Sequence, residues 1–165
     1  ARIGYTLKHY PGLGSDPADA SHSTDTEPNT VTEPAAEIHA DDAAYRECGN
    51  GAVMLSSASY PALSGRAPAV LSRSIYAKTL RGDHVHGLLI SDTFTGGAIK
   101  NQRTPAKTAI SLGLDMVMYP DTMSSGLGAY GSLLADVKSG SLGAARVQAA
   151  AAKVLAYKKA LGLGS

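Results

Sequence analysis

Gly87-Leu88-Leu89-Ile90-Ser91-Asp92 is a short apolar run that ends in a carboxylate, and stretches of this kind decide the fold of the chain. Three other runs resemble it, and turn residues bound each of them. All four are nearly continuous in apolar residues, as in strands that are buried on both faces of a parallel sheet. We therefore expect four parallel strands, at residues 3–7, 52–55, 87–90 and 114–118.

Helical stretches separate these runs. A Thr32 cap, Pro34 in the first turn and the stop at Gly49 predict a helix over residues 33–48. Capping residues, glycine stops and helical spacing of apolar residues predict the others, at 73–80, 103–112, 127–138 and 142–161. The order β-α-β-α-β-α-β-α predicts an α/β fold with parallel crossovers.

Length and composition exclude several classes of protein. A chain of 165 residues with 44% hydrophobic residues fits one soluble domain over residues 1–165. The 15 Lys and Arg residues balance 14 Asp and Glu residues, which argues against a nucleic-acid partner. The sequence shows neither an apolar run of membrane length nor a signal-peptide pattern, so we expect no membrane partner and leave the compartment open. A chain that opens inside a strand is typical of a piece of something larger, natural or engineered.

Two polar groups follow predicted strands, where parallel sheets bind ligands. Lys8 and His9 stand at the end of the first strand, and the alternative is an incidental pair in a β-α turn. Asp92 stands at the end of the third strand. Its side chain could act either as a helix cap or as a catalytic carboxylate. Residues 12–31 contain almost no apolar side chain, which favours an active-site loop that is mobile without ligand.

Other polar residues favour ordinary structural roles. His84 and His86 form a tempting metal pair, but they precede a strand, at the end where barrel sites are not built. We expect His39, beside Asp41 and Asp42, to mark a solvated helix face, and Cys48 to be a buried, inert thiol.

Lys8-His9-Tyr10-Pro11-Gly12-Leu13-Gly14 resembles the Lys-His-Phe-Pro-Gly-x-Gly signature of family 3 glycoside hydrolases, especially their bacterial β-N-acetylglucosaminidase branch. The run 87–94 followed by Gly97-Ala98-Ile99 is similar to the nucleophile segment of that family. Residues 51–56, residues 113–118 and the closing helix also match, in family order. The resemblance implies strands five to eight of a (β/α)₈ TIM barrel, which is half of that barrel.

The resemblance also implies residue roles in a retaining hydrolase of β-glycosides such as N-acetylglucosaminides. Asp92 is the expected catalytic nucleophile, and His22 is the expected acid/base, oriented by Asp19 or by Asp25. The family's Asp-x-His is matched by Asp19-Ala20-Ser21-His22, which has one extra residue. Lys8 and His9 would bind the hydroxyls of a small carbohydrate substrate, and the chemistry needs no cofactor and no metal. The substrate-binding Asp and Arg residues that the family carries on the strands of the first half of its barrel have no counterpart in this chain.

Two other functions stay open on the sequence alone. One is a promiscuous hydrolase of another ester, such as a phosphoester. The other is a catalytically silent half-barrel that serves as a structural unit. In every case half a barrel leaves two open sheet edges and a bare inner face, which we expect to be built from Val53, Leu55, Leu89 and Val117. We therefore expect a homodimer that closes eight strands about a two-fold axis.

Overall fold

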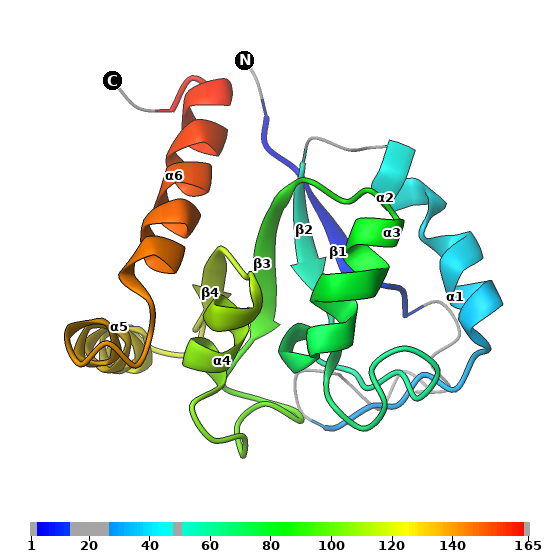
Figure 1. The fold of residues 1–165 in the computed structure, drawn as a ribbon, viewed down its shortest axis with the longest axis horizontal. Coiled ribbons are helices and arrows are strands. Elements are labelled where there is room, and N and C mark those ends of the chain that lie inside the picture. Colours follow the sequence, from blue (N-terminus) through cyan, green and yellow to red (C-terminus); the bar gives the residue numbers. More distant parts are fainter. Residues whose placement is uncertain (1–2, 14–26, 48–50, 164–165) are drawn as a thin grey trace.

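The computed structural model describes residues 3–13, 27–47 and 51–163. Its centre is one sheet of four parallel strands in the order β1-β2-β3-β4 (Figure 1), so every strand pairs with its neighbour in the sequence. The strands are β1 (Thr6–Tyr10), β2 (Ala52–Leu55), β3 (Leu88–Thr93) and β4 (Met116–Met118). The prediction of a parallel α/β fold is confirmed.

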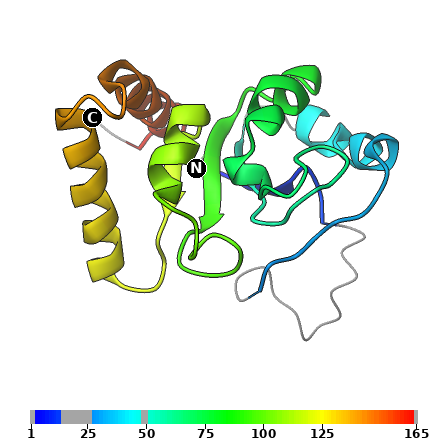
Figure 2. The ribbon, with the colours of Figure 1, turned by 60° about the horizontal axis from the view of Figure 1, so that its bottom comes forward.

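The connections between the strands are helical. The helices are α1 (Ala35–Asp41), α2 (Ala43–Glu47), η1 (Ala69–Leu71), η2 (Ile75–Thr79), α3 (Leu80–Gly82), α4 (Pro105–Leu112), α5 (Met123–Lys138) and α6 (Ala144–Ala160). In Figure 1 α3 and α4 lie in front of the sheet, and Figure 2 shows α4, α3 and α1 following one another in an arc. None of the helices in the described ranges is long and apolar enough to cross a membrane.

Several of the predicted boundaries are wrong. The third strand ends at Thr93 rather than at residue 90, and the fourth begins at Met116 rather than at residue 114. The first strand begins at Thr6 rather than at residue 3, because Thr6 is the first residue that pairs with β2, and Ile3 is 84% exposed. The helix expected over 33–48 is divided at Asp42. Helix α5 begins at Met123 rather than at residue 127, because the Thr122 hydroxyl accepts a hydrogen bond from the Ser125 N–H (3.1 Å) and caps the helix there.

Neighbouring rows of the sheet have different surroundings. In register, Leu7, Val53 and Leu89 form one row, and Val53 and Leu89 are buried in the core beneath the helices. The next row faces the other way, because side chains alternate along a strand. Its members are half-buried or exposed, and we call them the open face: Lys8, Met54, Ile90 and Met116.

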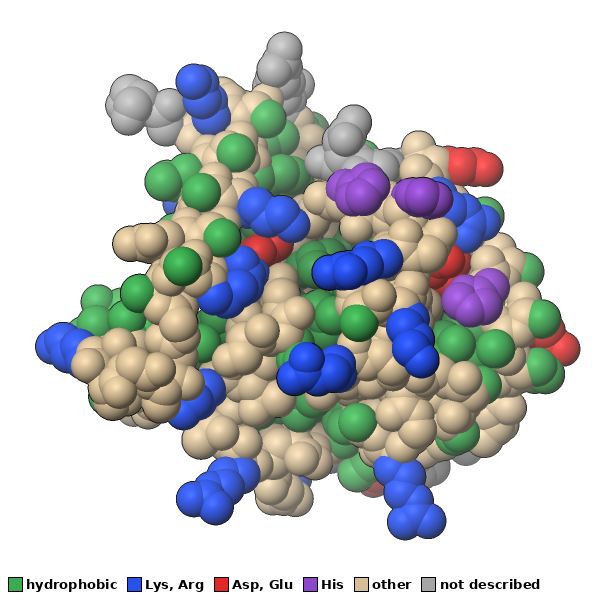
Figure 3. All heavy atoms as spheres, in the orientation of Figure 1, with side chains coloured by type: hydrophobic (Ala, Val, Ile, Leu, Met, Phe, Trp, Pro, Cys, Tyr) green, Lys and Arg blue, Asp and Glu red, His purple; other side chains and the backbone are tan. Residues whose placement is uncertain are grey.

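The residues that we expected on a bare inner face lie on the helix side instead. Val53, Leu55 and Leu89 belong to the buried core, and Val117 packs against it. Apolar helix residues such as Val70, Ile75 and Ala109 complete this core. The predicted composition of the inner face is therefore wrong. The residues of the open face are the sequence neighbours of those that we expected, for example Met54 in place of Val53. The outer side of the helices is a solvated surface, with Lys and Arg side chains scattered over it (Figure 3).

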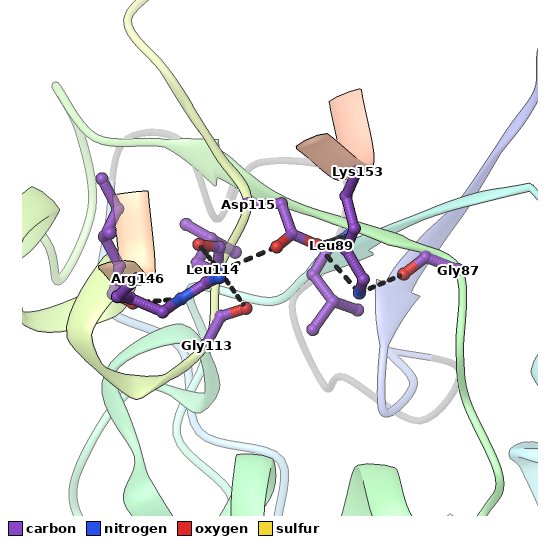
Figure 4. A network of polar contacts seen from close by, with 8 residues as sticks. Gly87, Leu89, Gly113, Leu114, Asp115, Arg146 and Lys153 are labelled. Atoms are coloured by element: carbon purple, nitrogen blue, oxygen red, sulfur yellow. Dashed lines mark hydrogen bonds and ion pairs between the residues drawn. The ribbon is translucent and has the colours of Figure 1, made fainter. Parts of the chain in front are cut away.

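A buried carboxylate fastens α6 to the sheet (Figure 4). The Asp115 side chain is 1% exposed and pairs with Arg146 (2.7 Å) and Lys153 (3.2 Å), both from α6. It also accepts a hydrogen bond from the Leu89 N–H of β3 (3.1 Å). Arg146 donates further to the carbonyls of Gly113 and Leu114, just before β4. These contacts fix the end of α4, the start of β4 and α6 relative to one another.

Candidate active site

Asp92 stands near the carboxyl end of β3, where a parallel sheet places its ligand-binding groups. The pairing of β3 with β4 shifts between Ile90 and Thr93, so Asp92 falls in the irregular end of β3. The residue is 4% exposed. One carboxylate oxygen, Oδ1, accepts a hydrogen bond from the Thr93 N–H (2.8 Å). This bond fixes the carboxylate at the strand end.

His9 approaches Asp92 from a strand that is not its neighbour. His9 Nε2 lies 3.8 Å from Asp92 Oδ2, and the His9 side chain is 19% exposed. Strands β1 and β3 are separated by β2, so in a flat sheet their backbones would stand about 10 Å apart. The two side chains therefore converge across the end of β2, as residues do on the concave side of a curved sheet. An imidazole and a buried carboxylate are thus brought together by the fold.

Lys8 is the other predicted binding residue. It belongs to β1, in register with Met54, and its side chain is exposed. The strand pairing shifts between Lys8 and Tyr10, so His9 falls in the irregular part of β1. A cavity of about 380 Å³ opens beside this edge of the sheet, lined by Leu7, Lys8, Gly12, Asp41, Ala44 and Tyr45.

The segments that flank these residues are held by buried tyrosines. Tyr10 is fully buried and meets the Tyr45 ring edge to face, with 5.0 Å between the ring centroids. The Tyr60 hydroxyl donates a hydrogen bond to the Gly12 carbonyl (2.8 Å), which fixes the turn after β1. After β2, the Ser57 hydroxyl is buried and makes no hydrogen bond within the part of the chain that the structure describes. Ser57 Oγ is therefore a buried polar group at the end of the middle strand.

The predicted acid/base group lies outside the described residues. His22, Asp19 and Asp25 all fall between residues 14 and 26, as does most of the expected active-site loop. The described residues therefore bring together Asp92 and His9, with Lys8 adjacent to His9 in β1. Chemically, this arrangement offers a carboxylate as nucleophile, an imidazole beside it, and a cation along the same strand.

A second polar cluster lies behind the end of β1, and the sequence did not predict it. His39 Nδ1 is 3.3 Å from Asp42 Oδ2 and 3.6 Å from Asp83 Oδ1, and the Tyr10 hydroxyl donates to Asp83 Oδ2 (2.5 Å). Burial, reinforced by the neighbouring Asp83 carboxylate, raises the pKa of Asp42 to about 8. His39 is exposed, as expected of a solvated helix face, but its ring also lies close to both carboxylates. Asp41 and Asp42 were a local signal, but Asp83 is too distant in sequence to be linked to them.

The exposed histidines His84 and His86 precede β3, with their ring centroids 6.3 Å apart. They stand at the opposite end of β3 from Asp92. Within the described ranges, His39, Asp42 and Asp83 are the three residues close enough together to share one metal ion.

Comparison with known proteins identifies one family. Residues 1–157 match the sequence model described as "Glycosyl hydrolase family 3 N terminal domain". A curated protein of Arthroderma benhamiae, described as an uncharacterized secreted glycosyl hydrolase, is 28% identical over 94% of this chain and 46% of its own length. The chain thus spans about half the length of the curated relative that it matches.

Solved structures show the same similarity. A family 3 β-N-acetylglucosaminidase from a Paenibacillus strain superimposes with a TM-score of 0.85 at 27% identity, over 99% of this chain and 32% of that one. A β-N-acetylhexosaminidase from Beutenbergia cavernae gives a TM-score of 0.80 at 28% identity, over 93% of this chain and 46% of that one.

Proposed function

Because the chain belongs to glycosyl hydrolase family 3, we propose that it carries the nucleophile half of a retaining β-glycosidase that acts on N-acetylglucosaminides or similar glycosides. The proposal on the sugar is supported by the solved relatives, whose names specify β-N-acetylglucosaminidase or β-N-acetylhexosaminidase. The observation that carries the proposal is the position of Asp92, a buried carboxylate near the end of β3 with His9 at 3.8 Å.

The reaction assigned to Asp92 proceeds by two displacements. A carboxylate oxygen of Asp92 forms a bond to the anomeric carbon while the glycosidic C–O bond breaks, and His22 gives its proton to the leaving oxygen. A water molecule then attacks the same carbon, returns a proton to His22 and releases Asp92 as a free carboxylate. Asp19 or Asp25 would hold the imidazole of His22 in the orientation for this transfer. No step requires a cofactor.

His9 and Lys8 take the role of sugar ligands. Both belong to β1, and His9 lies close enough to Asp92 to hydrogen-bond a hydroxyl next to the reacting carbon. The exposed Lys8 ammonium offers hydrogen-bond donors to the sugar hydroxyls. These groups would position the sugar so that its anomeric carbon meets the Asp92 carboxylate.

A panel of aryl β-glycosides that includes the N-acetylglucosaminide tests this function. We expect turnover of the N-acetylglucosaminide, with the β-anomer as first product, because two displacements retain configuration. Mass spectrometry of protein quenched during turnover should show a glycosyl group on the peptide that contains Asp92. An adduct on another peptide, or inversion of configuration, would contradict the assignment.

We further propose that the four strands are half of a closed barrel, which a second copy of the chain completes. Among the described residues, β1 and β4 each have a strand on one side only. The open face and an exposed apolar stripe on α5, formed by Met123, Leu127, Tyr130 and Leu134, also favour burial against another body. Pairing β4 of each copy with β1 of the other would close eight strands and place both Asp92 residues on one rim.

Sedimentation of the chain at micromolar concentration tests the dimer. The expected species has twice the mass of the 16.9 kDa chain. A folded, compact monomer under these conditions would exclude closure by a second copy. Its glycosidase activity could still be measured separately, so the two proposals fail independently.

A further inference from the structure

The cluster of His39, Asp42 and Asp83 has the composition of a metal site. Each residue offers one ligand atom, and the three atoms lie within 4.8 Å of one another. His39 and Asp42 come from the end of α1, and Asp83 comes from the turn after α3. Zinc binds His nitrogen and Asp or Glu oxygen in proteins, and this cluster offers one imidazole nitrogen and two carboxylate oxygens.

The distances fit an ion at the centre of the cluster. Zinc binds nitrogen and oxygen ligands at 2.0–2.2 Å, so two ligands of a tetrahedral site stand about 3.3–3.6 Å apart. His39 Nδ1 lies 3.3 Å from Asp42 Oδ2 and 3.6 Å from Asp83 Oδ1. Both distances match an edge of such a tetrahedron.

The burial of Asp42 is an independent observation that points to a cation. Its side chain is 0% exposed, and Oδ1 has no hydrogen-bond partner among the residues that the structure describes. A buried carboxylate oxygen without a donor costs free energy unless a positive group neutralises it. A metal ion bound through the carboxylate group of Asp42 would supply this charge.

The surroundings orient one of the ligands, Asp83, and place one opposing charge beside it. The Tyr10 hydroxyl donates to Asp83 Oδ2 (2.5 Å), which orients this carboxylate in the way that second partners orient metal ligands. Burial raises the pKa of Tyr10, so the hydroxyl remains a donor. The Arg46 guanidinium lies 3.7 Å from Asp83 Oδ1 with 38% of its side chain exposed, and its positive charge opposes an incoming cation.

The cluster is accessible from the surface. The His39 side chain is 44% exposed and borders a cavity of about 370 Å³, together with Thr79 and Gly82. This cavity offers an entry path for the ion and space for water as a fourth ligand.

We propose that His39 Nδ1 and the carboxylates of Asp42 and Asp83 form a zinc site, with water in the fourth position. The bound ion joins α1 to the turn after α3 and, through Tyr10, to the end of β1 beside His9. Its role is structural, and it takes no part in the glycosidase reaction proposed for Asp92. Evidence against the zinc site would therefore not contradict the proposed glycosidase function, and evidence against that function would not contradict the zinc site.

Titration of the metal-free chain with Zn²⁺, followed by calorimetry and by thermal unfolding, tests the site. We expect one ion per chain and a higher unfolding midpoint, because an ion that binds the folded state stabilises it. His39→Ala should weaken binding by at least ~10-fold, and it should fold because the ring is partly exposed. The matched control is His86→Ala, which removes another exposed histidine and should leave the affinity unchanged.

The Arg46→Gln variant tests the same cluster by a substitution that should strengthen Zn²⁺ binding instead of weakening it. Removing the positive charge 3.7 Å from Asp83 Oδ1 should tighten Zn²⁺ binding several-fold. Co²⁺ in place of Zn²⁺ should give the intense visible absorption of four-coordinate cobalt in the wild type and lose it in His39→Ala. Zinc binding that survives His39→Ala, or that depends on His86, would overturn the proposal. So would an absence of saturable binding, which would leave the cluster as an ion-pair network.

Discussion

The two faces of the sheet differ although they are built from alternate residues of the same strands. The helix side holds Val53 and Leu89, which are 3% and 8% exposed and lie in the core. Met54 and Ile90, one residue further along each strand, are half-buried on the open face, and Met116 is 42% exposed. The composition of the two rows is similar, so hydrophobicity alone does not decide which row is covered.

The buried residues on the helix side of the sheet stabilise the fold, whereas the candidate catalytic residues lie outside this core. Apolar residues on the helix side contribute burial free energy, at about 25 cal/mol per Å² of apolar surface. The candidate chemistry lies instead at the irregular end of β3, where Asp92 approaches His9. Substitutions on the helix side should therefore change folding, and substitutions at Asp92 should change turnover.

The largest expected effect comes from Asp92→Asn. The amide is nearly the same size but is a far poorer nucleophile than the carboxylate, so turnover of aryl glycosides should fall by at least ~10³-fold. The thermal unfolding midpoint should stay close to that of the wild type.

The matched control is Ser91→Ala, one residue earlier in β3. Ser91 Oγ accepts a hydrogen bond from the Met118 N–H (2.8 Å), so its loss should cost about 1 kcal/mol of stability. The temperature at which activity is measured can be chosen so that both variants are folded. Equal losses of activity in Asp92→Asn and Ser91→Ala would remove the distinction between the two faces.

The second prediction compares Leu89→Ala with Ile90→Ala, two substitutions that remove side chains of similar size. Leu89→Ala should lower the free energy of unfolding by about 2–5 kcal/mol, because it leaves a cavity in the core. Ile90→Ala should cost only about 1 kcal/mol in a monomer, where the side chain is half-buried. Urea unfolding measures both values. A cost for Ile90→Ala as large as that for Leu89→Ala would mean that another body covers the open face.

The sequence predicted the order of the elements better than the direction of the side chains. Four apolar runs with capped helices between them suffice for a parallel α/β fold. However, a strand that is apolar at every position has no period-two pattern, so nothing local says whether Val53 or Met54 meets the helices. The register with neighbouring strands decides this, and register depends on contacts between residues far apart in the chain.

The candidate site shows the same limit. A short local motif was enough to single out Lys8, His9 and Asp92, because each lies at or near a predicted strand end. The approach of His9 to Asp92 across β2 depends on the curvature of the sheet, and a sequence does not display curvature. The cluster of His39, Asp42 and Asp83 was missed because its third member joins it only through tertiary packing.

The third prediction tests the register of the strands, which determines which side chains lie on each face of the sheet. A Cβ at Gly87 would come within 2.2 Å of the Gly51 carbonyl oxygen, so Gly87→Ala forces the start of β3 away from the segment before β2. We expect a cost of about 1–3 kcal/mol in urea unfolding. Gly82→Ala is the control, because a Cβ there meets no atom within 4 Å and the residue ends a helix. The control should be neutral or slightly stabilising, and a loss as large as that of Gly87→Ala would point to a general intolerance of the region rather than to the register.

The smallest expected effect on folding is that of Met116→Lys on β4. Met116 is 42% exposed on the open face, so a lysine there can keep its charge in water, and the free energy of unfolding of a monomer should change by less than about 0.5 kcal/mol. The same substitution would place a charge inside a barrel closed by two copies, where an unpaired buried charge is strongly unfavourable. Sedimentation of wild type and variant at equal concentration therefore sharpens the comparison. If the open face is an interface, the wild type should be dimeric and Met116→Lys monomeric. If both sediment alike and unfold alike, the open face is solvated in this chain, and β4 does not close a barrel with a second copy.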